Sequence, residues 1–271
     1  MVMSCHSIVQ KDPNSNAADA VARSADTPRI QQNSVGIEVY TLRISSNQTD
    51  FVKKLWQETD EQALPPSLRR ELIAQGFRAG VIGNFTPAAL AYLLQSPGKI
   101  ETTQSDNGSF REIPVADLMK ESAGTRQFRN ILPDMRAWIL PFEAPLPEYA
   151  LFWNDNGFFT GATLQNAVGI LTIQAVAEKD GSATLTIVPE LEYGYSQLKY
   201  RPQAGIVVSE MQRPRKKFEM LSLSQKLLPG QWFIVGASSM DSPGAGRAFF
   251  FREEGVLEQR LIAIRLLKAV Q

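Results

Sequence analysis

The stretch VGILTIQAVAEKDGSATLTIVPELE, residues 168–192, carries the strongest structural signal in the chain. In Val168–Ala177 and Ala183–Leu191, apolar residues alternate with Thr and Gln. This two-residue period is that of a strand with one buried face and one face in water. Asp180-Gly181, between the two segments, is a turn signal. The sequence therefore predicts two strands separated by a turn, each with one buried face and one face in water.

Further strand signals follow one another from residue 131 to the end of the chain. Turn signals separate them, among them Asn154-Asp155-Asn156-Gly157, Pro229-Gly230 and Glu253-Glu254-Gly255. Short strands at such spacing are typical of an antiparallel sandwich or a curled sheet. We therefore expect a mostly antiparallel β domain over residues 131–271. Its other predicted strands are Met135–Leu140, Ala150–Trp153, Phe158–Thr160, Ile206–Ser209, Phe218–Lys226, Trp232–Val235, Arg247–Phe251 and Arg260–Leu267.

The region before this domain alternates between the strand period and the helix period. Pro65-Pro66 and Thr86-Pro87 indicate helix starts, because proline is favoured in the first turn, and Gly76 indicates a helix end. The predicted elements are a strand at 37–44, a helix from 49 to 59, a helix after Pro66, a strand at 77–82 and a helix ending at 95. This order predicts a small β-α-α-β-α module over residues 36–100, followed by a connector over residues 101–130. The expected fold class is α+β, with a small α/β module followed by a mostly antiparallel β domain.

The first 35 residues differ in composition from the rest of the chain. No Phe, Trp or Tyr precedes Tyr40, and the apolar residues are mostly alanine. Such a segment cannot bury enough apolar area to offset the loss of conformational entropy on folding. We therefore expect residues 1–35 to form a disordered tail.

Val2-Met3-Ser4-Cys5 resembles the end of a bacterial lipobox, in which the cysteine becomes lipid-modified. Only four residues precede Cys5, whereas a secretory signal needs an apolar stretch of about 7–15 residues. Two interpretations stay open. If translation starts further upstream, Cys5 carries a lipid anchor and the protein lies in the cell envelope or periplasm. Otherwise Cys5 is an ordinary cysteine and the protein is cytoplasmic.

The composition excludes several classes of function. Lys+Arg 28 balance Asp+Glu 28, which argues against a general nucleic-acid binder because such proteins need a net basic surface. The single cysteine and the single histidine are Cys5 and His6. The folded body therefore holds no Cys- or His-ligated zinc site, no Ser-His-Asp or Cys-His catalytic system and no intrachain disulfide. We expect no metal and no cofactor, and we expect Gly244-Ala245-Gly246 to form a flexible loop, since no P-loop lysine follows it.

The last part of the chain shows a particular order of strand signals. A strand ending near a proline is followed by a strand that leads into a Gly-Gln turn, an Ile-Val-Gly strand and an apolar last strand; these pieces are Thr184–Glu192, Phe218–Val235 with Gly236, and Arg260–Leu266. In this order, residues 168–270 resemble the C-terminal β domain of secretins, the ring-forming outer-membrane proteins of bacterial secretion and pilus systems. Only Asp241–Arg252 stands where secretins have their gate and membrane-facing hairpins. The resemblance therefore implies a secretin-like sheet without a pore.

Two groups of charged residues are candidate sites. Glu190 and Glu192 lie two apart on a predicted strand and so on the same face. Such a pair could serve a carboxylate-based hydrolase or bind Ca²⁺ or Mg²⁺, but a solvated strand face is the simpler interpretation. The basic run could bind an anionic surface such as phosphate, lipid headgroups or cell-wall polyanions, or it could only keep a strand edge soluble. It consists of Arg213, Arg215, Lys216 and Lys217.

The segment Phe249-Phe250-Phe251 is dense in aromatic residues. If it is a strand, Phe250 points to the opposite face from its two neighbours. We expect these side chains to pack in the core, with an interface as the alternative.

Three functional hypotheses follow. The first is a non-enzymatic bacterial cell-envelope protein with a secretin-like β domain, which acts through protein–protein contacts. The second is a carboxylate-based hydrolase, and the third is a cytosolic binding module of unknown ligand. We favour the first, and we expect protein partners, with a homo-oligomer as one option, no nucleic acid, and membrane contact only through a lipid on Cys5.

Overall fold

The computed structural model describes residues 33–44, 48–95, 101–104, 124–155, 158–203, 206–239, 244–254 and 256–270. Their strands form two larger sheets and one separate two-stranded ribbon, and all but one of the strand pairings are antiparallel. The predicted α+β class with mostly antiparallel sheets is therefore confirmed. Most of the predicted tail, including Cys5, and most of the predicted connector lie outside the described residues.

Sheet A has the strand order β2-β13-β15-β1-β4-β3, and β14 also pairs with β15. Its centre is the long pairing of β1 with β15, in which Ser34 lies opposite Val270 and Ile44 opposite Gln259. Strands from the last part of the chain, β13 and β15, thus lie between the strands β2 and β1 from its first part, so the predicted α/β module and β domain share a core. The strands are β1 Ser34–Ile44, β2 Phe77–Ile82, β3 Glu101–Gln104, β4 Gly124–Ile131, β13 Trp232–Ala237, β14 Phe251–Glu254 and β15 Val256–Val270.

Sheet B is built around the two strands predicted from residues 168–192. β7 and β8 pair antiparallel from Val168 opposite Glu192 to Ala177 opposite Ala183. The two predicted strands Phe158–Thr160 and Val168–Ala177 are parts of one 20-residue strand, which pairs first with β6 and then with β5. The strands are β5 Ala137–Ile139, β6 Leu146–Asp155, β7 Phe158–Ala177, β8 Ala183–Glu192, β11 Arg215–Lys217 and β12 Leu223–Leu227.

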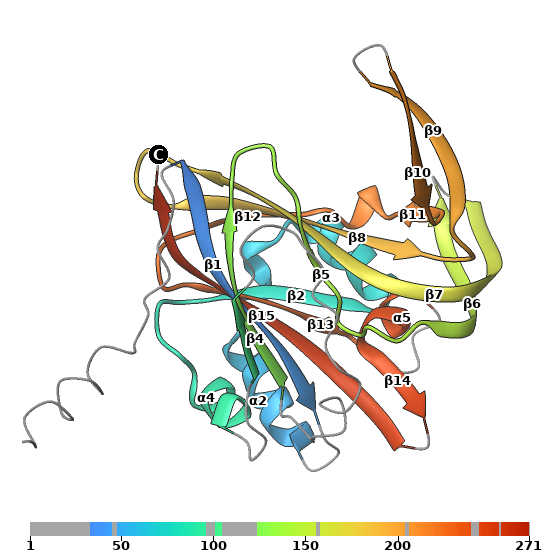
Figure 1. The fold of residues 1–271 in the computed structure, drawn as a ribbon. Helices are drawn as coiled ribbons and strands as arrows, with labels where there is room; N and C mark the ends of the chain where they lie inside the picture. Colours follow the sequence, from blue (N-terminus) through green and yellow to red (C-terminus); the bar gives the residue numbers. More distant parts are fainter. Residues whose placement is uncertain are drawn as a thin grey trace, which may run out of the picture.

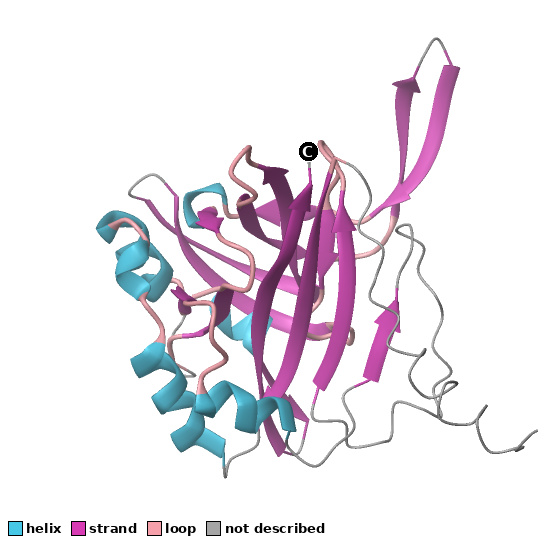
Figure 2. Ribbon diagram, turned by 90° about the vertical axis from the view of Figure 1, so that its left-hand side faces the viewer, coloured by secondary structure: helices cyan, strands magenta, loops and turns pink. Residues whose placement is uncertain are grey.

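The two sheets pack face to face, and the helices α2, Thr49–Glu58, and α4, Ala88–Gln95, cover the other face of sheet A (Figures 1 and 2). Alternate residues of β1 point to opposite faces of sheet A. Ile37 belongs to the core between the sheets, whereas Leu42 belongs to the core under the helices. Leu55 of α2 and Leu90 of α4 are fully buried in that second core. The described helices are α2 Thr49–Glu58, α3 Pro66–Ala74, α4 Ala88–Gln95 and α5 Gly246–Phe250, with 3₁₀ turns at Glu61–Ala63 and Glu219–Leu221.

The predicted strand Arg247–Phe251 is wrong, because most of it is the helix α5. A β-carbon on Gly246 would lie 2.2 Å from the carbonyl oxygen of Gly76, so only glycine lets the chain pass against the end of α3. The backbone N–H of Gly246 donates to the carbonyl of Gln75 at 2.8 Å. Gly244-Ala245-Gly246 is therefore a buried packing contact and not the flexible loop that we expected.

The helical turn also changes the geometry of the phenylalanines. Phe249 and Phe250 both contact the ring of Phe77, with ring centroids 5.1 and 5.6 Å apart. The predicted opposite orientation of Phe249 and Phe250 is therefore wrong, while their predicted core packing is confirmed.

The third group of strands is a ribbon that rises away from the two sheets in both views (Figures 1 and 2). It consists of β9, Gln197–Gln203, and β10, Ile206–Gln212, which pair antiparallel only with each other in the part of the chain that the structure describes. The predicted strand Ile206–Ser209 is part of β10, whereas β9 was not predicted. None of the described helices has the length and hydropathy that a membrane span requires.

Candidate functional site

The two groups of charged residues singled out in the sequence meet at the base of the ribbon. β11 pairs with the end of β8, which places Arg215 opposite Glu192 and Lys217 opposite Glu190. Arg215 lies 2.9 Å from Glu192 and 3.7 Å from Glu190, and Lys217 lies 3.8 Å from Glu190. Arg213 completes the ion-pair ladder at 3.3 Å from Glu192. The carboxylates and the cations are thus each other's partners.

Glu190 is the buried member of this ladder, with 3% of its side chain exposed. The predicted solvated face is therefore wrong at this position, because β11 brings two cations over the carboxylate. A buried carboxylate needs such partners, since an unpaired charge away from water is costly. Both carboxylates are engaged in ion pairs, so the role of the ladder is to hold β8 and β11 together.

Arg213 fastens the chain where the ribbon leaves the sheet. Its guanidinium donates to the carbonyl oxygen of Gly194 at 3.1 Å and to that of Asn166. The backbone N–H of Gly194 also donates to the carbonyl of Gln165 at 2.6 Å, and Gly194 has a φ of 69°. One side chain thus connects the entry of the ribbon, its exit and strand β7.

The remaining member of the basic run lies on the other face of β11. The Lys216 ammonium lies 4.8 Å from the centroid of the Trp153 ring, a cation–π distance, whereas Arg215 lies 5.5 Å from that of Trp138. The structure therefore does not bring the four predicted anion-binding residues together on one surface: Arg215 and Lys217 lie on one face of β11 and Lys216 on the other, and Arg213 precedes the strand.

The ribbon exposes large apolar side chains on one face. The exposed fractions are 52% for Leu198, 67% for Tyr200 and 61% for Met211. The register places Met211 opposite Leu198 and Ser209 opposite Tyr200, so these side chains share a face. Gln197 and Gln212 form the neighbouring pair and belong to the opposite face. We call the surface formed by Leu198, Tyr200, Ser209 and Met211 the ribbon face.

Sequence reasoning missed the ribbon face because β9 lacks a continuous apolar pattern. Its sequence QLKYRPQ contains two cations and a proline. The available signal was the spacing of Leu198 and Tyr200, two residues apart like neighbours on one face of a strand.

A second polar cluster that the sequence did not reveal surrounds Glu38 on β1. Its side chain is 4% exposed, its carboxylate accepts a hydrogen bond from the Tyr40 hydroxyl at 3.2 Å, and it pairs with Arg126 of β4. Arg265 of β15 lies 4.0 Å away and its guanidinium stacks 5.3 Å from the Trp232 ring. Burial, and next the charge of Glu38, raise the pKa of Tyr40 to about 12. This cluster joins three strands of sheet A.

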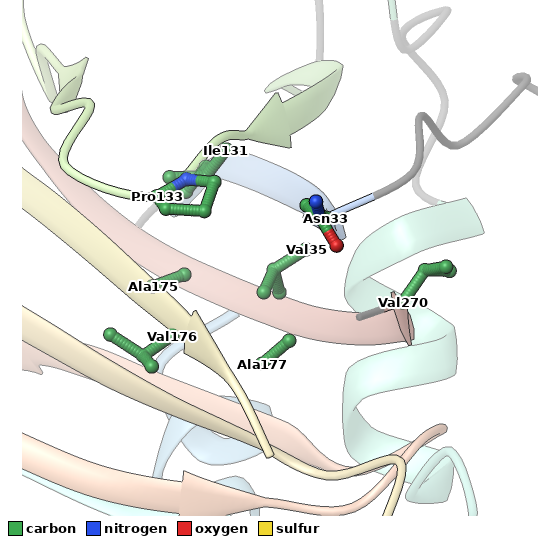
Figure 3. Close-up of a pocket in the computed structure, with 8 residues that line it drawn as sticks. All are labelled: Asn33, Val35, Ile131, Pro133, Ala175, Val176, Ala177 and Val270. Atoms are coloured by element: carbon green, nitrogen blue, oxygen red, sulfur yellow. The ribbon is translucent and has the colours of Figure 1, made fainter. Parts of the chain in front are cut away.

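Two pockets on the surface are lined by few side chains that could take part in a reaction. One of about 200 Å³ opens between the ends of the two sheets (Figure 3) and is lined by Asn33, Val35, Ile131, Pro133, Ala175, Val176, Ala177 and Val270. A wider, polar hollow of about 450 Å³ lies beside α2, and the Arg78–Glu61 ion pair lines it. The described residues contain no cluster of three side chains able to hold a metal ion.

Comparison with known proteins yields no relative: no family model, no curated protein and no solved structure matches the chain. The pieces that resemble secretins lie in both sheets, with β8 and β12 in sheet B and β13 and β15 in sheet A. The resemblance stays a prediction. The ribbon with its anchored base is the candidate site that the geometry offers.

Proposed function

We propose that this protein is non-enzymatic and acts through protein–protein contacts, and that the ribbon face makes the contact. The observation that carries the proposal is the exposure of Leu198, Tyr200 and Met211 on a ribbon that projects from the body. Keeping apolar area in water costs about 25 cal/mol per Å². Contiguous exposed apolar surface on a folded protein therefore marks an interaction site.

The state of the charged groups supports a binding role over a hydrolase. A carboxylate-based glycosidase needs two acidic groups free to act on the substrate, about 5–9 Å apart. Glu190 and Glu192 instead form ion pairs with Arg215, and Glu190 is buried. An anionic ligand would likewise have to displace these carboxylates before it could reach Arg215 or Lys217.

The remaining parts of the favoured hypothesis are proposals of the same kind. The lipobox-like Cys5 supports a location in the cell envelope, and the order of strands supports a secretin-like β domain. The order β1-α2-α3-β2-α4 supports the view that residues 36–100 form an α/β unit, whose strands here are completed by β13, β15 and β4. Mass spectrometry of the protein purified from its own cells would show a diacylglyceryl adduct on Cys5 if the envelope location holds, and an unmodified cysteine contradicts it.

Site-specific photo-crosslinking in the cells that make the protein tests the ribbon contact. A photoreactive phenylalanine replaces Tyr200 on the ribbon face, and the control carries it at Gln197 on the opposite face. We expect a defined protein adduct from position 200 and a much weaker one from position 197. If position 200 gives no adduct, or if both positions give the same adducts, the ribbon face is not the contact surface.

A further inference from the structure

The polar hollow beside α2 is large enough for a small ligand. It lies between the end of α2, the 3₁₀ turn Glu61–Ala63, the start of α3 and β2, and its volume is about 450 Å³. Small-molecule sites occupy roughly 300–1,000 Å³. Its charged residues are Glu58, Asp60, Glu61, Arg69 and Arg78. Of these, Arg78 and Glu61 form an ion pair, and the Arg78 guanidinium lies 4.6 Å from the centroid of the Trp56 ring. Three charged groups thus remain to meet a ligand.

The backbone at the wall of the hollow is held in place. The N–H of Asp60 donates to the carbonyl oxygen of Val81 at 2.8 Å, and the N–H of Val81 donates to that of Asp60 at 3.0 Å. A β-carbon on Gly80 would lie 2.6 Å from Cγ2 of Thr59, so glycine allows this wall to approach β2. The Asp60 carboxylate accepts the N–H of Gln62 at 2.9 Å. A wall that is ordered beforehand lowers the entropic cost of binding.

Arg69 is the positive group of the hollow that lacks a counter-charge among the described residues. No described carboxylate forms an ion pair with it, and its Nε atom is buried without a hydrogen-bond partner. A guanidinium partly removed from water costs free energy until an anionic group meets it. The planar fork of arginine fits a carboxylate through two parallel hydrogen bonds. Arg69 therefore indicates where the anionic group of a ligand would lie.

Negative charge gathers at the other side of the hollow, where α2 ends. Glu58 is the last residue of α2 and Asp60 follows it closely, and neither carboxylate has an ion-pair partner in the part of the chain that the structure describes. The last turn of α2 contains no basic residue, and the C-terminus of a helix carries partial negative charge. This side of the hollow therefore attracts a cationic group.

We propose that the hollow binds a small zwitterion, a molecule that carries a carboxylate and an ammonium group, as amino acids do. The carboxylate pairs with Arg69, and the ammonium group lies against Glu58 and Asp60. An anion alone would meet the excess of carboxylates in the hollow, and a cation alone would leave Arg69 without a counter-charge. The inference is independent of the ribbon-face contact, because no residue of the ribbon lines the hollow.

An NMR titration of the full chain tests the proposal. The probes are glycine, β-alanine and γ-aminobutyrate, whose two charges lie at increasing distances from each other. The indole N–H signal of Trp56, assigned with a Trp56→Phe variant, should shift and saturate with at least one probe, since Trp56 lines the hollow. We expect a dissociation constant of about 1 mM, because exposed ion pairs are individually weak. Butyrate and butylamine, which carry one charge each, should bind about tenfold more weakly.

Variants of the charged residues locate the contact. Arg69→Gln should weaken binding of the best probe about tenfold, because the carboxylate loses its charged partner. Glu58→Gln should weaken it about threefold, since Asp60 still faces the ammonium group. The matched control is Arg70→Gln: Arg70 follows Arg69 on α3, is exposed and does not line the hollow. It should bind the probe as the wild type does. The thermal midpoint establishes that each variant is folded.

Three outcomes overturn the proposal. The first is the absence of a saturable shift with all three zwitterions. The second is equally tight binding of butyrate or butylamine, which would show that one charge is sufficient. The third is an equal loss of affinity in the Arg69 and Arg70 variants, which would show that the overall charge of the surface matters and not the hollow.

Discussion

Glu38 shows how a single residue connects parts of the chain that are distant in sequence. Its carboxylate lies on β1, between Arg126 of β4 and Arg265 of β15, and it accepts the hydroxyl of Tyr40. Trp232 of β13 extends the cluster through its contact with Arg265. The cost of burying this charge is offset only while its partners remain.

Replacing the carboxylate should therefore destabilise the whole protein. We expect Glu38→Gln to lower the free energy of unfolding by about 3 kcal/mol, because two arginines lose their counter-charge in a partly buried site. The matched control is Glu143→Gln, since Glu143 is exposed, and it should change stability by less than about 0.5 kcal/mol. Urea denaturation measures both values. Equal effects in the two variants would show that the Glu38 cluster contributes nothing specific.

Tyr40 makes stability depend on pH in the alkaline range. Its pKa is about 12 in the folded protein and about 10 in an unfolded chain. A raised pKa means that folding favours the neutral phenol, so its contribution is complete below pH 10 and is lost as the pH rises to 12. Tyr149, whose pKa burial also raises to about 12, acts in the same direction.

The Tyr40→Phe variant isolates the contribution of the first tyrosine. Phenylalanine cannot ionise, so the variant should lose less unfolding free energy than the wild type between pH 9 and pH 12, by up to about 2 kcal/mol. Denaturant titrations at a series of pH values measure this difference. Parallel curves for the two proteins would mean that Tyr40 ionises equally easily in the folded and unfolded states.

At the scale of elements, we expect one side chain, that of Arg213, to limit the mobility of the ribbon. We expect Arg213→Gln to speed hydrogen exchange of the β9 and β10 amides about tenfold, since the variant loses bonds to Gly194 and Asn166 that resist local opening. The matched control is Lys226→Gln, which breaks the exposed 2.7 Å ion pair with Asp180 at the other end of β8. Exposed pairs contribute little, so the control should leave ribbon exchange unchanged. Unchanged exchange in the Arg213 variant would contradict the anchor.

Patterns within short stretches of sequence predicted several strands and helix ends. The alternation on either side of Asp180-Gly181 predicted the second half of β7 and β8, and the prolines and Gly76 predicted the ends of α3 and the start of α4. The helix α5 was missed because a run of phenylalanines has β propensity. Its helical turn depends on the close approach of Gly246 to Gly76, a contact between distant segments.

The candidate site was predictable in its parts and not in its assembly. The acidic pair and the basic run were visible as charges, but their pairing depends on the register of β8 with β11. The whole ribbon separates these two strands in sequence. The Glu38 cluster gave no local signal, because its arginines belong to β4 and β15.

At the scale of the whole molecule, the ribbon and the body are separable. None of the ribbon side chains that the structure describes belongs to either hydrophobic core. We expect replacement of Gln197–Gln212 by a short Gly-Ser linker to shift the thermal midpoint by less than about 3 °C, because Arg213 still holds the strand ends beneath it. Differential scanning calorimetry measures the shift. A loss of cooperative unfolding would show that the body needs the ribbon.

The pairing of Ser34 with Val270 has a consequence for how the molecule could be rewired. The start of β1 and the end of β15 lie side by side, so a short linker between them would make the backbone circular without disturbing any strand pairing. That circular backbone could be cut at the solvent-facing bend Asp180-Gly181. A circular permutant opened in this way keeps every strand pairing of the two sheets, although β8 and β7 become its terminal strands.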